Sequence, residues 1–414
     1  MMRTHYAKDV SPDLDGKEVA LAGWVHEIRD LGGLKFVLLR DRTGIVQITL
    51  KKKEADPALV ESVKHLVKEN AVTCVGVVKS AKIAPGGFEV VPKSISVVGP
   101  VHGTVPFEVT GKVPADLDVR LDKRFIDLRR PKTTAVFKVK STILQAFREK
   151  LVEDDFVEIN PPCLVSTSTE GGTDLFPVVY FEKEAFLAQS PQLYKQLAVM
   201  GGLDKVFMVS PVFRAEKHNT TAHLNEIIQM DAEMGFADSN DALDELEKVF
   251  LNVLKKVKDD HAVQMELLKQ KIEVPKKIKR FTYSDVVDQL TGAGYPLEWG
   301  EDFSKEQEKS MPTVLGEDLF IITDWPTKIR AFYSMPNEDN PEICLAYDLV
   351  YKGMEVASGA QRIHVPELLI KQLKAKGLRP AVFEKYIDAF RYGAVPHAGW
   401  SIGLERATQQ ICGL

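Results

Sequence analysis

At 414 residues the chain exceeds the size of one ordinary hydrophobic core, so two or three domains are expected. Its composition, 44% hydrophobic and 27% charged, is that of a globular protein, and no apolar run is long enough to span a bilayer. The net charge of −5 argues against a general nucleic-acid coat, which would be basic, but local RNA binding stays open because charge distribution matters more than the sum.

The N-terminal residues lack the apolar core of a signal peptide, which predicts a cytoplasmic location. The four cysteines, Cys74, Cys163, Cys344 and Cys412, are widely separated and form no CxxC pair. Such spacing is typical of reduced thiols in apolar surroundings, not of a zinc site or a disulfide framework.

Residues 17–98 are rich in β-forming residues, with short apolar runs separated by glycine and proline turns. The predicted strands cover residues 19–25, 35–40, 45–50, 71–78 and 88–98. A helix is predicted at residues 57–69, between the third and fourth strands. Five strands with a helix after the third is the order of an OB barrel, an oligonucleotide-binding fold, although other small β-barrels share it. We expect this domain to occupy residues 1–100.

A linker rich in proline and charge is expected at residues 101–131, and an α+β domain at residues 132–414. The apolar spacing predicts a long amphipathic helix at residues 134–154. A second helix is predicted at residues 239–260, with Ser239 as its N-cap. Further strands are predicted at residues 156–159, 185–187, 206–209 and 227–236. Together they favour one mixed, largely antiparallel sheet.

Two segments of this second domain carry candidate chemistry. Residues 212–216 form a predicted strand end with Arg214 and Glu216, followed by a polar loop and a second strand. An arginine at this place can hold a phosphate and a carboxylate together through its planar fork of donors. Residues 399–406 form a glycine-bearing strand that opens a helix carrying Arg406. Either segment alone is also consistent with a β-hairpin bearing surface charges.

Taken together, the ordered segments resemble the three signature motifs of class II aminoacyl-tRNA synthetases. Residues 156–162 resemble the first motif, whose last proline, here Pro162, lies at a dimer interface. Residues 213–216 and 403–406 resemble the second and third. The strings at residues 169–172, 189–196 and 355–362 are similar to those of aspartyl-tRNA synthetases, most closely the archaeal and eukaryotic type.

The resemblance extends over essentially the whole chain and implies an α+β protein. An N-terminal OB-fold β-barrel would bind the anticodon, and a class II catalytic domain would follow, built on a mostly antiparallel sheet flanked by helices. The implied activity is an aspartate–tRNA ligase. L-aspartate is activated with ATP and Mg²⁺ to aspartyl-adenylate and is then attached to tRNA by a cytoplasmic homodimer.

The resemblance also implies an aspartate-binding site. Lys195 and Arg362 would hold the side-chain carboxylate, since a lysine point charge beside an arginine fork suits a partly desolvated anion. Glu170, in a segment resembling a lid, would hold the ammonium group, and Gln192 would add a hydrogen bond. For Lys195 the alternative is a surface helix residue. The complete implied set for aspartate is Glu170, Gln192, Lys195, Arg214, Ser358 and Arg362.

For ATP, the resemblance implies that Arg214 bridges the α-phosphate and the reacting carboxylate. Glu355 and Ser358 would hold magnesium, a hard cation that prefers oxygen ligands. Arg406 would stack on adenine and face the γ-phosphate. Arg214, Glu355 and Arg406 are the implied catalytic residues. The implied ATP contacts are Arg214, Ala215, Glu216, Ala222, His223, Leu224, Glu355, Gly403, Leu404, Glu405 and Arg406.

The chain departs from the family pattern in three places. Ser401 stands where the family usually has glycine, which predicts a narrower ATP shelf. Ile227 stands where a stacking aromatic is frequent, so the adenine site would have an apolar wall without a ring face. Family members also continue past the third motif, whereas this sequence ends at Leu414, and we expect an open site on that side or a shortened sequence.

For tRNA, the resemblance implies that Phe36 stacks on an anticodon base and Gln47 hydrogen-bonds, with Arg29 and Glu89 as helpers. Phe36 could equally serve as a barrel residue. In archaeal-type enzymes a Trp and Lys pair at two barrel positions accompanies strict use of tRNA(Asp), whereas His and Pro accompany relaxed use. Here His26 and Pro85 stand there, which predicts a non-discriminating enzyme whose Asp-tRNA(Asn) passes to an amidotransferase. A plain surface role is the alternative for His26.

Three other functions fit parts of the sequence. An asparaginyl-tRNA synthetase is the nearest, but that family usually has Leu-Glu where this chain has Lys195-Gln196, and an amide substrate has little use for a second cation. A synthetase-like ATP-dependent amide-forming enzyme would typically lack the OB domain. A non-catalytic RNA-binding protein would have no need of Arg214, Glu355 and Arg406.

We expect purified tRNA(Asn) to be charged with aspartate at a rate comparable to that of tRNA(Asp), because His26 and Pro85 match the relaxed pattern. Steady-state charging of the two tRNAs by the same enzyme preparation measures this directly. A rate for tRNA(Asn) on the order of a thousandfold lower, a barrier difference of about 4 kcal/mol, would contradict the prediction.

Overall fold

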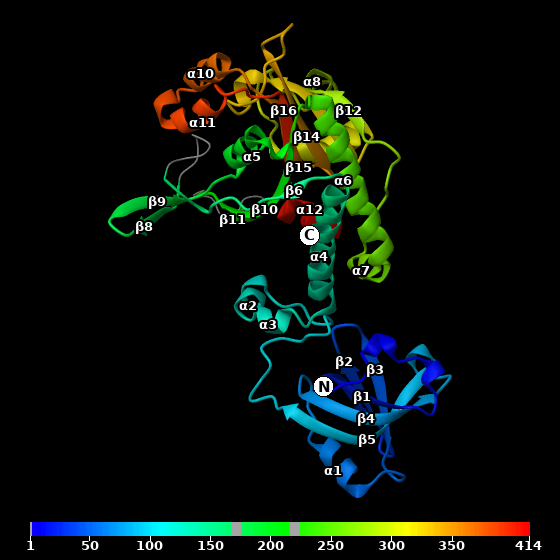
Figure 1. Cartoon of the computed structure of the whole chain (residues 1–414). Coiled ribbons are helices and arrows are strands. Elements are labelled where there is room, and N and C mark those ends of the chain that lie inside the picture. Colours follow the sequence, from blue (N-terminus) through cyan, green and yellow to red (C-terminus); the bar gives the residue numbers. More distant parts are fainter. Residues whose placement is uncertain (1, 167–174, 216–223) are drawn as a thin grey trace. The chain divides into compact units, whose positions relative to one another are not determined.

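The computed structural model describes residues 2–166, 175–215 and 224–414, and it divides into two compact units, Met1–Thr134 and Ala135–Leu414 (Figure 1). Glu170, Glu216, Ala222 and His223, which the sequence analysis singles out, lie outside the described residues. None of the helices in the described ranges is long and apolar enough to cross a membrane.

The first unit contains a closed five-stranded barrel with the strand order β1-β2-β3-β5-β4. Its strands are β1 (Glu18–Asp30), β2 (Leu34–Arg40), β3 (Ile45–Lys51), β4 (Ala71–Ser80) and β5 (Phe88–Gly99). The short helices of this unit are η1 (Ala7–Asp9), η2 (Pro12–Leu14), α1 (Pro57–Lys64), η3 (Pro85–Gly87), α2 (Leu117–Asp122) and α3 (Arg124–Asp127). All five predicted strands are present, and the OB-fold prediction is confirmed.

Helix α1 is shorter than predicted, because it ends at Lys64 and not at residue 69. Glu69 has a left-handed backbone with φ of 67°, a conformation that cannot continue a helix. Its amide nitrogen donates to the carbonyl of Val25 in β1, at 2.8 Å. The carboxylate of Glu69 is buried against Arg40, so a long-range ion pair overrides the local helical pattern.

The second unit is built on an eight-stranded sheet with the order β12-β13-β14-β15-β16-β11-β10-β6. Only the β12–β13 and β10–β6 pairs are parallel, which confirms the predicted mixed and largely antiparallel sheet. Its strands are β6 (Val157–Glu158), β10 (Lys205–Phe213), β11 (Glu226–Gly235), β12 (Lys279–Thr282), β13 (Leu319–Pro326), β14 (Ile343–Tyr351), β15 (Met354–Arg362) and β16 (His397–Gly403). A separate sheet contains β7 (Leu164–Val165), β8 (Pro177–Tyr180) and β9 (Lys183–Leu187).

The helices of the second unit flank the sheet, as predicted (Figure 1). They are α4 (Pro131–Glu153), α5 (Gln192–Ala198), η4 (Val199–Leu203), α6 (Ser239–Asp260), α7 (Ala262–Leu268), α8 (Tyr283–Gly292), α9 (Lys305–Leu315), η5 (Thr327–Ile329), α10 (Pro366–Ala375), η6 (Pro380–Phe383), α11 (Glu384–Ala389) and α12 (Leu404–Cys412). The predicted cap of α6 is wrong by one residue. Ser239 is already helical, and the Asp238 carboxylate accepts from the amide nitrogens of Asn240 and Asp241 at 2.7 and 3.0 Å.

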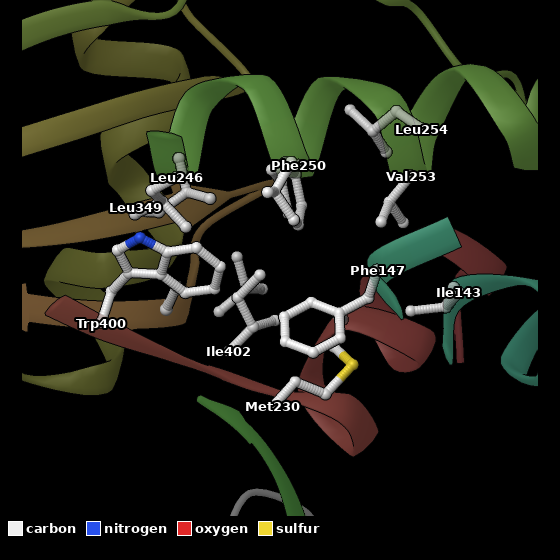
Figure 2. Packing of buried hydrophobic residues seen from close by; sticks show 14 of the residues in the cluster. Ile143, Phe147, Met230, Leu246, Phe250, Val253, Leu254, Leu349, Trp400 and Ile402 are labelled. Carbon is white, nitrogen blue, oxygen red and sulfur yellow. The ribbon is translucent and has the colours of Figure 1, made fainter. Parts of the chain in front are cut away.

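The largest core lies between α4, α6 and one face of the sheet (Figure 2). Along β11, Met230 and Ala232 point into this core, so the alternation of a strand sends Asp231 and Glu233 to the opposite face. Phe147 of α4 is fully buried and meets Phe207 and Trp400 edge-to-face, with ring centroids 5.8 and 6.0 Å apart. The core therefore fixes which face of the sheet carries the polar side chains.

The substitution Phe147→Ala is expected to lower the free energy of unfolding by about 3–5 kcal/mol, because it removes a buried ring and leaves a cavity. Urea unfolding followed by intrinsic fluorescence measures the change. Phe181→Ala is the matched control, since the Phe181 side chain is 86% exposed. Equal losses in the two variants would contradict this account of the core.

Candidate active site

The polar face of the sheet carries a cavity of about 390 Å³. Residues from β11, β15, β16 and the start of α12 line it, together with residues near α5 and in the segment before β14. Of the residues predicted to bind substrates, those in the lining are Gln192, Arg214, Leu224, Glu355, Ser358, Arg362, Gly403, Glu405 and Arg406. Segments more than 200 residues apart in the sequence thus meet at one place.

A β-bulge determines that Glu355 and Ser358 share this face. Residues three apart on a regular strand point to opposite faces. In the β14–β15 pair, Leu349 is opposite Ala357, but Val350 is opposite Glu355, so Val356 is an extra residue. The bulge shifts the alternation by one residue and turns Glu355 toward the cavity, a typical use of bulges beside functional sites.

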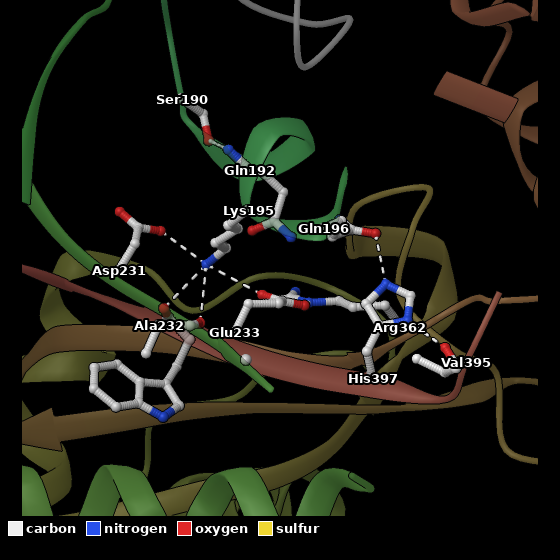
Figure 3. Close-up of polar contacts among 12 residues, drawn as sticks. Ser190, Gln192, Lys195, Gln196, Asp231, Ala232, Glu233, Arg362, Val395 and His397 are labelled. Carbon is white, nitrogen blue, oxygen red and sulfur yellow. Dashed lines mark hydrogen bonds and ion pairs between the residues drawn. The ribbon is translucent and has the colours of Figure 1, made fainter. Parts of the chain in front are cut away.

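Four buried charges form a cluster at one end of the cavity (Figure 3). The ammonium of Lys195 is 2.8 Å from Asp231 Oδ1 and 3.4 Å from Glu233 Oε2. Arg362 donates from Nε and Nη2 to the two oxygens of Glu233, at 2.9 and 3.2 Å. Two cations and two carboxylates therefore balance, and we call Lys195, Asp231, Glu233 and Arg362 the charge quartet.

Lys195 lies at the base of the charge quartet and not in the cavity wall. Its side chain is fully buried and also donates to the carbonyl oxygens of Trp400 and Ala232, at 3.0 and 3.4 Å. The alternative of a surface helix residue is therefore wrong. Arg362, by contrast, lines the cavity, with its guanidinium 5.5 Å from the centre of the Tyr333 ring.

The two carboxyls of the charge quartet have opposite pKa shifts. Burial raises the pKa of Asp231, and the Lys195 charge offsets this only in part. Burial also raises the pKa of Glu233, but the charges of Arg362 and Lys195 outweigh it, so that pKa lies below its usual range. His397, next to the quartet, has its pKa lowered to about 4 by burial, so it is neutral near pH 7.

Several polar atoms in the cavity wall are buried and have no hydrogen-bond partner in the described part of the chain. They are Gln192 Nε2, Gln229 Oε1, Asp231 Oδ2 and Ser401 Oγ. An unsatisfied buried polar group costs about 1–3 kcal/mol, which folded proteins generally avoid. Their concentration here is typical of a site that receives a polar ligand.

Arginines occupy the other end of the cavity. Arg214 follows β10 directly, and its amide nitrogen donates to the Asn225 carbonyl at 2.9 Å, which extends the β10–β11 pairing. Arg406 donates from Nη1 to the backbone oxygen and to Oε2 of Glu355, both at 3.2 Å. These guanidinium groups lie where fixed cations can hold the phosphates of a nucleotide.

A second ion pair supports the centre of the cavity. Arg330 donates to both oxygens of Asp348, at 2.8 and 2.6 Å, and to Ser358 Oγ at 2.8 Å. Burial raises the pKa of Glu355, and so does the charge of Asp348. A divalent cation would relieve this repulsion, so the oxygens of Glu355 and Ser358 fit magnesium in chemical type. No cluster of three or more metal-ligating His, Cys, Asp or Glu occurs in the described ranges, but magnesium generally uses only one or two protein carboxylates.

The remaining predicted ATP contacts differ in placement. Glu405 lines the cavity, but its carboxylate binds Lys140 at 2.9 Å and accepts from the Ile228 amide nitrogen at 2.9 Å, so it anchors α12. Leu404 is buried in the core below the site. Ala215 follows Arg214 in the chain but is not part of the lining, whereas Ile227 forms an apolar section of the wall.

Sequence reasoning missed four residues of this site: Asp231, Glu233, Arg330 and Asp348. A signal was available for the first two, because Gln229, Asp231 and Glu233 alternate with apolar residues in one strand. Alternation predicts a common face for them but not which partners that face meets. Arg330 had no comparable signal, since it lies in an irregular segment after η5.

On the barrel, four of the predicted anticodon contacts share one outer face. Arg29 is paired with Phe36 across β1 and β2, and Phe36 with Thr49 across β2 and β3. Thr49 donates to Glu89 at 2.6 Å, and Gln47 donates to Thr49 at 3.4 Å. The Phe36 side chain is half-buried on this face, whereas Val37 points into the barrel core.

His26 and Pro85 lie elsewhere. His26 is the extra residue of a bulge in β1, is only 9% exposed, and its Nδ1 is 2.8 Å from Arg40 Nη1. Arg40 pairs with both oxygens of Glu69, which also binds Arg129 at 3.0 Å. With so little exposure and this buried partner, the plain surface alternative for His26 is wrong. Burial and the Arg40 charge also lower the pKa of His26. Pro85 is exposed in the η3 turn.

Comparisons with known proteins agree with this geometry. The family described as tRNA synthetases class II (D, K and N) matches residues 116–414, and the family described as OB-fold nucleic acid binding domain matches residues 19–98. The chain therefore belongs to the class II tRNA synthetases and is a ligase that uses ATP.

Individual relatives narrow the class. The Aspartate–tRNA(Asp/Asn) ligase of Methanocaldococcus jannaschii is 48% identical over 410 residues, 99% of this chain and 93% of the relative. That of Methanothermobacter thermautotrophicus is 46% identical and covers 100% of this chain and 95% of the relative.

Among solved structures, asparaginyl-tRNA synthetase from Pyrococcus horikoshii complexed with asparaginyl-adenylate has a TM-score of 0.94 at 33% identity, with 100% of this chain and 96% of that chain covered. A putative aspartyl-tRNA synthetase from Leishmania major has a TM-score of 0.91 at 29% identity, with 100% and 91% covered.

The substitution Lys195→Met is expected to lower the free energy of unfolding by about 3–5 kcal/mol at pH 7, because it leaves a buried negative charge unpaired. The deficit should shrink as the pH falls through the pKa of Asp231, since a protonated carboxyl needs no cation. Urea unfolding over a pH series measures both effects.

Lys248→Met is the control for this substitution. Lys248 is 60% exposed and pairs with Glu245 at 3.2 Å, so its loss should cost less than about 1 kcal/mol. A deficit in Lys195→Met that does not change with pH would contradict the role given to the charge quartet.

Proposed function

We propose that this chain activates L-aspartate with ATP and transfers it to tRNA(Asp) and tRNA(Asn). The observation that supports the proposal is the charge quartet: its Arg362 lies at one end of a cavity whose other end carries Arg214 and Arg406. The names of the relatives from Methanocaldococcus jannaschii and Methanothermobacter thermautotrophicus support the same substrate and the same pair of tRNAs.

Aspartate would lie with its side-chain carboxylate at Arg362 and its ammonium at Asp231. Nε and Nη2 of Arg362 are engaged by Glu233, so Nη1 is the nitrogen that can reach a ligand in the cavity. Oδ1 of Asp231 is taken by Lys195, which directs Oδ2 toward the ligand. Lys195 then acts from below: its charge favours the ionised form of Asp231 against the effect of burial and adds positive potential at the aspartate carboxylate.

In the activation step, the aspartate α-carboxylate attacks the α-phosphorus of ATP and pyrophosphate leaves. Charge spreads over the phosphate oxygens in the transition state, so positioned cations matter more than a base. Arg214 would hold the carboxylate and the α-phosphate together, and Arg406 would neutralise the departing phosphates. Each preorganised donor of this kind is typically worth about 3–4 kcal/mol in the transition state.

Magnesium, when bound, would neutralise phosphate charge, with Glu355 and Ser358 as its protein ligands. In the structure Glu355 Oε2 is bonded to Arg406 and Ser358 Oγ to Arg330. The two oxygens would be available to the metal if both arginines turned toward phosphate oxygens.

The outer barrel face with Arg29, Phe36, Gln47 and Glu89 would bind the anticodon by stacking and edge contacts. His26 is buried, so in this proposal it affects base preference through Arg40 and not by touching RNA. The homodimer, the downstream amidotransferase and the cytoplasmic location remain predictions from the sequence.

An asparaginyl-tRNA synthetase is the second candidate, since that enzyme from Pyrococcus horikoshii has a closely similar fold. The charge quartet favours aspartate. A neutral amide gains little from a guanidinium backed by a second buried cation, whereas a carboxylate gains a charge-assisted hydrogen bond.

ATP–pyrophosphate exchange with the 414-residue chain tests the proposal. We expect exchange with L-aspartate and a kcat/KM for asparagine lower by at least about a hundredfold, because the asparagine amide cannot form the charge-assisted hydrogen bond to Arg362. Preferred exchange with asparagine would establish the second candidate. No exchange with either amino acid, while tRNA still binds, would indicate a non-catalytic RNA-binding protein.

A further inference from the structure

Ser401 is the one side chain that β16 directs into the described part of the cavity. Gly399 and Gly403 share its face of the strand, and neither has a side chain. At Gly399 an added Cβ would lie 2.2 Å from Glu233 Oε2 and 2.3 Å from the Ala232 carbonyl oxygen, so no side chain fits there. At position 401 the strand has room for a side chain, and the serine hydroxyl occupies it.

The strand register places Ser401 between two residues with assigned roles. It is directly opposite Asp231 on β11 and directly opposite Ser358 on β15. Side chains opposite each other on neighbouring strands have Cβ atoms about 4.5–5.5 Å apart, so one small ligand group can touch both. The row Asp231–Ser401–Ser358 therefore crosses the cavity floor from the amino-acid end toward the phosphate end.

Ser401 Oγ is buried and makes no hydrogen bond of normal geometry to any described residue, although its hydroxyl lies close enough to Asp231 to favour the charged carboxylate. Asp231 Oδ2 is equally without a partner in the described ranges, and Asp231 is 1% exposed. In Figure 3 the second oxygen of Asp231 points away from Lys195. Asp231 and Ser401 are thus cross-strand neighbours in the cavity lining, and each has a buried oxygen without a partner among the described residues.

We infer that Ser401 binds the ammonium group of the amino-acid substrate together with Asp231. An ionised carboxylate only accepts hydrogen bonds and a hydroxyl can accept one, so the pair suits a ligand with several N–H donors. A phosphate oxygen at this place would meet the Asp231 charge, whereas a cation is attracted by it. The inference rests on the proposed function and adds a specificity residue to it.

The competing account is steric: the hydroxyl narrows the shelf for ATP and contributes no contact. The two accounts differ in which ligand responds to removal of the hydroxyl. If the hydroxyl binds the ammonium group, its removal weakens the binding of aspartate and leaves the binding of an analogue without an amino group unchanged. If the hydroxyl only narrows the ATP shelf, its removal improves the binding of ATP and raises the exchange activity.

The experiment compares wild type, Ser401→Ala and Ser401→Gly in ATP–pyrophosphate exchange. The KM for aspartate and for ATP is measured, together with the inhibition constant of succinate, which is aspartate without its amino group. We expect the KM for aspartate to rise about 10- to 100-fold in both variants, the size of one hydrogen bond to a charged group. The KM for ATP and the succinate constant should stay unchanged.

Ser210→Ala is the matched control. Ser210 Oγ is also buried without a partner among the described residues, but it belongs to β10 and is not part of the cavity lining. In this variant the KM for aspartate, the KM for ATP and the inhibition constant of succinate should equal those of wild type. Urea unfolding checks that each variant is folded. Ser401→Gly serves if Ser401→Ala does not fold.

A lower KM for ATP or faster exchange in Ser401→Gly would overturn the inference in favour of the steric account. An unchanged KM for aspartate in both Ser401 variants would also overturn the inference. An equal weakening of aspartate and succinate would place the hydroxyl at a carboxylate and not at the ammonium. If wild type shows no aspartate exchange at all, the proposed function fails, which is distinct from failure of the Ser401 assignment.

Discussion

The charge quartet is the constraint on which the site depends. Lys195 comes from α5, Asp231 and Glu233 from β11 and Arg362 from β15, so one group of ion pairs joins three elements that are distant in sequence. Every member is nearly inaccessible to water, and such charges are stable only when each has a partner. The ion pairs hold Arg362 and Asp231 in the cavity wall, and the charges of Lys195 and Glu233 beneath them are paired as well.

Local interruptions of regular strands then aim the remaining side chains. The extra residue Val356 turns Glu355 to the same face as Ser358. In the barrel, the extra residue His26 shifts β1 by one position, so Arg29 lies beside Phe36 on the outer face while Ile28 packs inward. Both bulges cost part of a hydrogen-bond ladder, and both give a binding face that an unbroken strand would not have.

Burial and function are linked through the same groups. Asp231 has a raised pKa because burial disfavours its charged form, and a cationic ligand at its second oxygen would favour that form. Burial likewise raises the pKa of Glu355, and the negative charge of Asp348 raises it further. The substrate ammonium at Asp231 and magnesium at Glu355 would thus each stabilise a carboxylate whose charge burial disfavours. The fold keeps these carboxyls buried at the site, so part of the binding energy comes from relieving that cost.

The sequence by itself determined the five barrel strands, the antiparallel sheet and the motif residues Arg214, Arg362 and Arg406, because alternation, turns and ordered motifs are local patterns. It could not show that Lys195 lies beneath the cavity, that His26 is buried against Arg40, or that a bulge brings Glu355 onto the face of Ser358. Those facts depend on partners from distant segments and on bulges. Only the tertiary structure decides them, since the energy of a buried charge is set by its neighbours in space.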